Sequence, residues 1–206
     1  MSYTVTDSYQ AIYRVKGSKF YSSIHFCTTD IDAEKILQTI KNEHPTATHC
    51  CFAAICISPN KIEMLSDDGE PGGTAGLPIL NVLKSTGLVN TIITVVRYYG
   101  GTKLGKSGLI DAYSTAASMV VESARIKQMI LIQKWLIQYD YQHQSIIDKL
   151  KNDFTLIEKE SIYLENVTLE IGIPNDLADQ VIQKLNSLKH LFIKLERIED
   201  SFHILK

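Results

Sequence analysis

Two glycine-rich segments hold the charged residues whose types and spacing suit chemistry. We call the first, SDDGEPGGTAGLP at residues 66–78, the acidic loop; its charged side chains are Asp67, Asp68 and Glu70. The second, RYYGGTKLGKSG at residues 97–108, is the basic loop; its charged side chains are Arg97, Lys103 and Lys106. Glycine lets a backbone approach a ligand closely or turn through positive φ, so both segments are typical of binding loops.

Residues 100–107 of the basic loop match the P-loop pattern G-x-x-x-x-G-K-S, between a predicted strand and a predicted helix. In P-loop chemistry backbone N–H groups hold phosphates, so Lys106 would reach the terminal phosphate and Ser107 would hold magnesium. One alternative is therefore a phosphate- or nucleotide-binding enzyme that uses this loop with a metal at Asp67 or Asp68. Against it, no apolar strand ending in Asp supplies a second metal ligand, and short motifs match by chance.

A broader interpretation of the basic loop needs no hydrolysis. A glycine loop at a helix N-terminus, flanked by Arg97 and Lys103, suits an anion from any source. Simpler alternatives stay open: the glycines serve only the turn from strand to helix, and Asp67 and Asp68 bond their own backbone. Tyr98 would either stack on a base or pack within its strand.

Capping residues and hydrophobic spacing predict the elements next to these loops. Thr74 is expected to cap a helix that ends at Gly87, where a left-handed residue fits. Residues 91–99, TIITVVRYY, are β-branched and aromatic and predict a buried strand. From Gly108 onward, small and apolar residues at helical spacing predict a closely packed helix.

The segments upstream complete a first α/β domain. A strand pair is expected at residues 3–15 and 18–28, and its turn at Gly17 carries a basic cluster that either is solvated or contacts phosphate. That cluster consists of Arg14, Lys16 and Lys19. Thr29 or Asp30 then caps a helix. Strands at 49–57 and up to Leu65 flank a turn at 58–61.

Residues 126–206 predict a second domain. Strands are expected at 129–139, 154–164, 167–173 and 191–198, with helices near 146–150 and 177–188. This β-α-β-β-α-β order is the ferredoxin-like arrangement. The sequence therefore predicts an α+β protein with domains at 1–125 and 126–206.

Composition narrows the class of protein. The formal net charge is −2, and residues 1–125 hold eleven basic and eleven acidic side chains, so any contact with nucleic acid must be local. No apolar run approaches the length of a membrane span and the first residues are polar, so we expect a cytoplasmic protein without membrane contact. The cysteines form no C-x-x-C pair, which favours reduced core thiols over a zinc site. We expect no metal and no cofactor.

Together the two loops resemble the signature of the YigZ/Impact family. The resemblance rests on SDDGEPGGTAGLPIL, then VVRYYGGTKLG followed by Ala112-Tyr113, and covers residues 16–124. It implies a ribosomal protein S5 domain 2-like fold for residues 1–125 and a ferredoxin-like domain, similar to one in elongation factor G, for residues 126–206. Eukaryotic members of this family regulate translation by competing for a ribosome-associated activator of the amino-acid-starvation kinase.

The resemblance also implies which residues make contacts. Matched residue by residue, the implied contact residues are Asp67, Asp68, Gly69, Glu70, Pro71, Gly73, Thr74, Arg97, Tyr98, Gly100, Gly101, Lys103 and Gly105. The family pattern typically differs at Lys106 and Ser107, which weakens the P-loop hypothesis. It supplies no catalytic residue and no metal ligand.

We therefore expect a non-enzymatic, translation-associated regulator that binds the ribosome, RNA or a translation-related protein through the paired loops, without a small-molecule substrate. The phosphate-handling enzyme is the alternative from another class, and a chaperone-like or purely protein-binding module is a third. Lys106→Ala separates the first two, because the enzyme would lose turnover. The binding module would instead be weakened by Arg97→Ala or Lys103→Ala.

Overall fold

A computed structural model describes residues 2–57 and 61–205 of the chain. These residues form a mixed α/β protein with two compact units, which meet in the sequence between Gln128 and Met129. Within the described residues, no helix combines the length and the apolar character that crossing a membrane requires.

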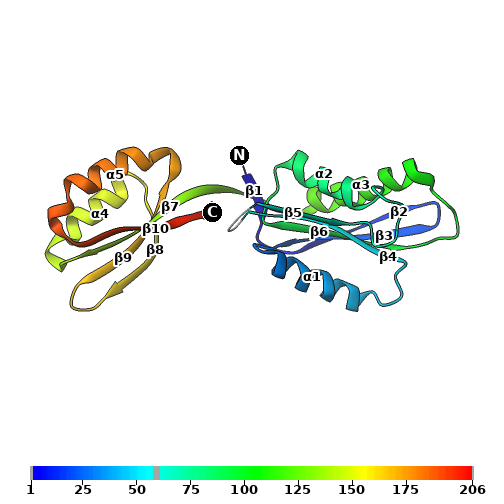
Figure 1. Ribbon diagram of the computed structural model, residues 1–206, viewed down its shortest axis with the longest axis horizontal. Coiled ribbons are helices and arrows are strands. Elements are labelled where there is room, and N and C mark those ends of the chain that lie inside the picture. The colour runs from blue at the N-terminus through cyan, green and yellow to red at the C-terminus, as the bar shows by residue number, and fades with distance from the viewer. Residues whose placement is uncertain (1, 58–60, 206) are drawn as a thin grey trace. The chain divides into compact units, whose positions relative to one another are not determined.

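The first unit is built on a five-stranded sheet in the order β2-β3-β6-β4-β5, in which all neighbouring strands are antiparallel. Helix α1 lies on one face of this sheet, and helices α2 and α3 lie on the other (Figure 1). The strands are β2 (Tyr9–Val15), β3 (Ser18–Phe26), β4 (His49–Cys56), β5 (Ile62–Ser66) and β6 (Thr91–Tyr98). The helices are α1 (Asp30–Glu43), α2 (Gly76–Thr86) and α3 (Gly105–Ser123).

The largest core of this unit lies between the sheet and helices α2 and α3. Phe20 and Ile24 of β3 and Val95 of β6 pack there against Tyr113 of α3. Ala116 and its small neighbours let α3 approach the sheet closely, as the spacing predicted. Strand β6 is buried along its length except at Tyr98, which confirms the predicted buried strand.

Several local predictions are confirmed. Thr29 is the N-cap of α1, where its side chain and that of Asp32 form a reciprocal capping box. Gly87 ends α2 in the left-handed conformation with φ 68°. The hairpin turn between β2 and β3 contains Gly17 at φ 77°.

The predicted cap of α2 at Thr74 is wrong. The N-cap of α2 is Ala75, which has no side-chain cap, and the Thr74 hydroxyl instead donates to the carbonyl oxygen of Pro71 over 2.6 Å. A carboxylate from earlier in the chain supplies the cap, as described below. Helix α3 begins at Gly105, three residues before the predicted start.

The expected strand at residues 3–15 is divided. Strand β1 (Ser2–Val5) ends before Thr6, and β2 starts at Tyr9. Between them Thr6 donates a hydrogen bond to the Asp7 carboxylate, a local contact that competes with strand pairing. Of the predicted turn at 58–61, residues 58–60 lie outside the described part of the chain.

The second unit contains the predicted β-α-β-β-α-β order. Its antiparallel sheet has the order β8-β9-β7-β10, and helices α4 and α5 cover one face of that sheet (Figure 1). The elements are β7 (Ile126–Tyr139), α4 (Gln144–Asp153), β8 (Ile157–Tyr163), β9 (Val167–Pro174), α5 (Ala178–Ser187) and β10 (Phe192–Ile204). Strand β10 extends six residues beyond the predicted end at residue 198 because it pairs with β7 along most of its length.

Candidate functional site

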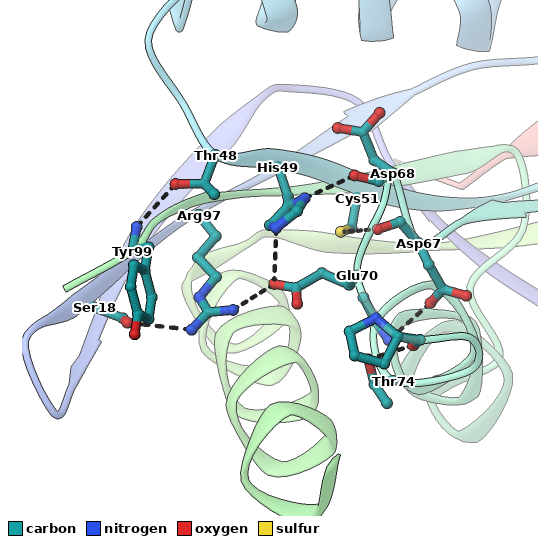
Figure 2. Close-up of polar contacts among 12 residues, drawn as sticks. Ser18, Thr48, His49, Cys51, Asp67, Asp68, Glu70, Thr74, Arg97 and Tyr99 are labelled. Carbon is teal, nitrogen blue, oxygen red and sulfur yellow. Dashed lines mark hydrogen bonds and ion pairs between the residues drawn. The ribbon is translucent and has the colours of Figure 1, made fainter. Parts of the chain in front are cut away.

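The acidic and basic loops meet at a buried ion pair. Arg97 Nη1 lies 2.6 Å from Glu70 Oε1, and the two side chains are only 6% and 4% exposed. Figure 2 shows Glu70 reaching from the acidic loop toward Arg97 at the end of β6. The opposite charges that the sequence places on separate loops therefore neutralise each other inside the protein.

Further groups fix this pair in place. The Tyr113 hydroxyl of α3 donates to Glu70 Oε1 over 2.8 Å, and His49 Nε2 lies 3.9 Å from the same oxygen. The Arg97 guanidinium lies over the rings of Phe20 and Tyr99, at 5.5 and 5.4 Å from their centroids. Both distances fall within the range of cation–π attraction.

Asp67 caps helix α2 from outside the helix. Its Oδ1 accepts the backbone N–H groups of Ala75 and Gly76 at 2.9 Å, and its Oδ2 accepts the N–H of Gly73 at 2.8 Å. Burial on its own raises the pKa of the Asp67 carboxyl, but these three donors lower its pKa below the usual value. Asp67 therefore satisfies the N–H groups of the N-cap residue Ala75 and of Gly76 at the start of α2, the role that the sequence assigned to Thr74.

Asp68 connects the acidic loop to β4 by a hydrogen bond and to α1 by an ion pair. Its Oδ2 accepts the backbone N–H of Cys50 over 2.6 Å, and its Oδ1 pairs with Lys41 at 3.0 Å. His49 Nδ1 donates to the carbonyl oxygen of the same aspartate over 2.8 Å (Figure 2). Among the described residues, no group of three or more His, Cys, Asp or Glu is placed to hold a metal ion.

The basic loop packs closely against the β2–β3 hairpin at two glycines, Gly17 and Gly100. A Cβ atom added at Gly100 would lie 1.9 Å from the carbonyl carbon of Gly17, so only glycine fits that contact. The Ser18 hydroxyl strengthens it by accepting the N–H of Gly100 over 3.2 Å. Two basic segments some 80 residues apart in the sequence thus share one end of the sheet.

We define the basic edge as the five cationic side chains on the two segments that this contact joins, the β2–β3 hairpin and the basic loop: Arg14, Lys16, Lys19, Lys103 and Lys106. All five residues are exposed. Within the described ranges none of the five has an acidic partner or a side-chain hydrogen bond. The basic edge is thus a local positive region on a chain whose net charge is −2.

A pocket of about 290 Å³ opens beside the buried ion pair on the α3 side of the basic edge. Glu70 and Arg97 contribute to its lining, together with Tyr99, Lys103 and Lys106. Helix α3 starts at this pocket with no side-chain cap and no acidic residue in its first turn. Its first N–H groups and the two lysines therefore favour negative charge.

The structure does not support the P-loop hypothesis. Strand β6 is antiparallel to both of its neighbours, β3 and β4, whereas a helix that follows a phosphate loop normally leads to a parallel strand. The carboxylates proposed as metal ligands, those of Asp67 and Asp68, already accept the backbone and lysine groups described above.

Most of the contact residues predicted from the sequence fall into two groups, one in the acidic loop and one in the basic loop. Gly69, Glu70, Pro71, Gly73 and Thr74 lie with Asp67 and Asp68 in the scaffold of the acidic loop. Gly100, Gly101, Lys103 and Gly105 form the exposed basic loop. Tyr98 belongs to neither group, because its side chain lies on the opposite face of β6 from Arg97, in contact with His44.

Three partners of the buried pair were not chosen as contact residues from the sequence: Ser18, His49 and Tyr113. Each lies far from Glu70 and Arg97 in the chain. His49 is the register partner of Arg97 across β4 and β6, a pairing that becomes visible only once the strand order is known.

The cysteines are core residues, as expected. Burial raises the pKa of the Cys50 thiol to about 11 and that of the Cys51 thiol to about 12. Both thiols therefore stay protonated at neutral pH and are poor nucleophiles. His49 and Cys50 point to opposite faces of β4, as alternation along a strand predicts.

Comparison with known proteins agrees with this arrangement of loops. The model of the Impact N-terminal domain matches residues 16–121, which contain both loops and the β2–β3 hairpin turn. IMPACT family member YvyE of Bacillus subtilis (strain 168) is 34% identical over 82% of this chain and 77% of its own length. IMPACT family member YigZ of Escherichia coli (strain K12) is 30% identical over 90% of this chain and 92% of its own length.

Both units also align with a solved structure. A crystal structure described as that of a hypothetical protein covers 96% of each chain at 26% identity, with a TM-score of 0.64. The family match and the two relatives together cover the loops, the buried ion pair and most of the second unit. The chain belongs to the Impact family.

Proposed function

We propose that this protein is a non-enzymatic, translation-associated regulator that binds the ribosome by placing its basic edge against RNA phosphates. Membership of the Impact family fits a translation-related role. The observation that carries the proposal is the cluster of five exposed cations without acidic partners, held together by the contact of Gly17 with Gly100. Binding to ribosomes places the protein in the cytoplasm.

The buried ion pair indicates that the two loops have different roles. Arg97 offsets the charge of Glu70, and Lys41 offsets that of Asp68. Asp67 faces backbone N–H groups, so the acidic loop opposes the approach of an anion less than three unpaired carboxylates would. Each lysine that contacts a phosphate releases counterions, so binding by the basic edge depends strongly on salt. In this account the acidic loop is the scaffold and the basic loop is the contact surface.

The same roles argue for binding rather than turnover. An enzyme that used Lys106 and Ser107 would need a magnesium ligand nearby, but the available carboxylates are already hydrogen-bonded. The pocket next to Arg97 contains no carboxylate free of a partner among its described lining residues. We therefore assign the basic loop no catalytic residue.

We further propose that the first unit has the ribosomal protein S5 domain 2-like fold and that the second is ferredoxin-like, with the boundary at residues 125–126. The run of β5, α2, β6 and α3 supports the first assignment. The antiparallel order β8-β9-β7-β10 on one layer of two helices supports the second. Fold alone does not fix function, so the proposal rests on the basic edge.

Co-sedimentation with purified ribosomes tests the proposal. We expect the wild-type protein to sediment at low salt and to be released at high salt, and Lys16→Ala/Lys103→Ala/Lys106→Ala to lose most of this binding. The matched control is Lys35→Ala/Arg125→Ala, which removes exposed cations away from the basic edge. Arg125 follows the end of α3, whose start at Gly105 lies about 28 Å away for a helix of 19 residues.

Three results would reject the proposal. The first is a wild-type protein that stays in the supernatant at low salt. The second is an equal loss of binding in the control variant. The third is salt-independent binding, which would favour a protein partner. Turnover of a nucleotide that disappears in Lys106→Ala would instead support the enzyme alternative.

A further inference from the structure

The face of the first sheet that carries α1 is only partly covered by that helix. Helix α1 packs over β4 and β6 through Ala33, Ile36 and Ile40. On β2 the residues of this face, Gln10, Ile12 and Arg14, stay exposed. Two adjoining hollows of about 570 and 450 Å³ lie along β2 and β3 and share Tyr21 and His44 in their linings.

Three aromatic rings gather where the two hollows meet. The ring centroids of Tyr21 and Tyr98 are 5.7 Å apart, and His44 lies 5.6 Å from Tyr21 and 5.9 Å from Tyr98. His44 Nδ1 and the Tyr98 hydroxyl form a hydrogen bond of 2.9 Å, which fixes both rings. None of the three residues is fully buried, so part of each is open to a ligand.

The same groove continues into the basic edge. Lys19 and Gly17 line the second hollow, and Arg14 is the strand partner of Lys19. The lining of the first hollow is mainly apolar, and Glu43 borders it. Ser23 and Thr94, which share a hydrogen bond of 2.7 Å, add two hydroxyl groups to that lining. The groove thus combines cations at one end with aromatic rings at its centre and a mainly apolar hollow beyond them.

We propose that this groove binds single-stranded RNA, with unstacked bases against the rings of Tyr21, His44 and Tyr98 and with phosphates on Lys19 and Arg14. Proteins that bind single strands without strict sequence preference combine a positive groove that follows the backbone with aromatic rings on which bases stack. Each hollow also lies within the roughly 300–1,000 Å³ of sites that hold small organic ligands, which gives room for a nucleotide.

The inference rests on the proposed function and makes it more specific. The proposed contact with ribosomal phosphates needs only positive charge, whereas the groove recognises the bases of a strand that is not paired. An acidic peptide would satisfy the lysines but would gain little from three aromatic rings. The expected target is therefore an exposed single-stranded segment of RNA rather than a duplex surface.

The test compares two fluorescein-labelled strands by anisotropy, using the full chain. One is a 12-nucleotide RNA without self-complementarity, and the other is an abasic strand with the same number of phosphates. We expect the wild-type protein to bind the abasic strand at least tenfold more weakly, which is the order of effect of losing a stacked base. Tyr21→Ala should weaken binding to the RNA by a similar factor and leave the abasic strand unaffected.

Controls separate loss of stacking from loss of fold. Tyr21→Trp should restore RNA binding, because a larger ring stacks at least as well. The comparison of the two strands on the wild-type protein needs no variant, so it stands even if Tyr21→Ala does not fold.

Equal binding of the RNA and the abasic strand would show that the groove does not recognise bases, and would reject the proposal. If that shared binding still disappears in Lys16→Ala/Lys103→Ala/Lys106→Ala, the proposed phosphate contact survives without the groove. If neither strand binds and ribosomes do not sediment the protein, both proposals fail. If a polyglutamate peptide displaces the labelled RNA as well as unlabelled RNA does, the ligand of the groove is an acidic protein segment and not RNA.

Discussion

At the scale of single residues, the carboxylates of the acidic loop act as structural acceptors. Asp67 accepts three backbone N–H groups, including those of the N-cap residue Ala75 and of Gly76, the first residue of α2. Asp67→Asn should lower the free energy of unfolding by about 1–3 kcal/mol at neutral pH, because the amide nitrogen cannot accept an N–H group and leaves at least one of these donors without a partner. Asp111→Asn is the matched control, since Asp111 is exposed on α3. Urea unfolding of the three proteins measures the effect.

The acid dependence of this effect has a definite sign. The pKa of Asp67 is below its usual value in the folded protein, so its contribution to stability is present above the unfolded pKa of about 4. That contribution is lost as the pH falls through the lower folded pKa. The difference between wild-type and Asp67→Asn should therefore shrink in acid. A difference that stays constant would contradict the capping role.

The buried ion pair of Glu70 and Arg97 should contribute to stability as a unit. Arg97→Met leaves the Glu70 carboxylate buried without its cation, which should cost about 3–5 kcal/mol of stability. Glu70→Gln/Arg97→Met should lose less than the sum of the two single variants, because no unpaired charge remains. Chemical unfolding in a double-mutant cycle measures this coupling. Purely additive losses would show that the pair does not act as a unit.

At the scale of elements, the close approach of the basic loop to the β2–β3 hairpin builds the basic edge. Gly100→Ala places a Cβ atom 1.9 Å from the Gly17 carbonyl carbon, so the two loops must move apart. We expect a loss of about 1–3 kcal/mol in stability and weaker ribosome binding. Gly72→Ala is the control, because no atom lies within 4 Å of its added Cβ and its φ is not positive. Equal effects of the two substitutions would contradict the account.

Elements with local signals were predictable from the sequence. The cap at Thr29, the end of α2 at Gly87 and the buried run of β6 each depend on neighbouring residues, and all three are confirmed. The cap by Asp67 was missed because its partners lie six to nine residues away, across a turn that sequence spacing does not fix. The contact of Gly17 with Gly100 depends on strand order, which no local pattern encodes.

At the scale of the whole molecule, the basic edge and the groove both belong to the first unit. In the second unit, the sheet face away from α4 and α5 carries a row formed by Glu160, Glu170, Leu136 and Glu196. Lys134 pairs with Glu170 at 2.9 Å on that face. Lys194 pairs with Glu196 on the same face, so the charges of this face largely offset one another. We therefore expect weaker attraction of RNA there than at the basic edge.

This distribution predicts how fragments behave. Residues 1–128 should keep salt-sensitive ribosome binding, whereas residues 126–205 should not sediment with ribosomes. Circular dichroism establishes first that each fragment is folded, and co-sedimentation then measures binding. Binding by the second fragment alone would show that the contact surface lies in the second unit and not at the basic edge.

The salt dependence of the ribosome affinity shows whether the basic edge binds ribosomal phosphates. In a plot of log K against log salt concentration, each phosphate contact contributes a slope of about −0.7 to −0.9. We predict that Lys16→Ala/Lys103→Ala/Lys106→Ala makes the slope shallower by about 2–3, while Lys35→Ala/Arg125→Ala leaves it unchanged. A triple variant with the wild-type slope would contradict the claim that the basic edge holds ribosomal phosphates.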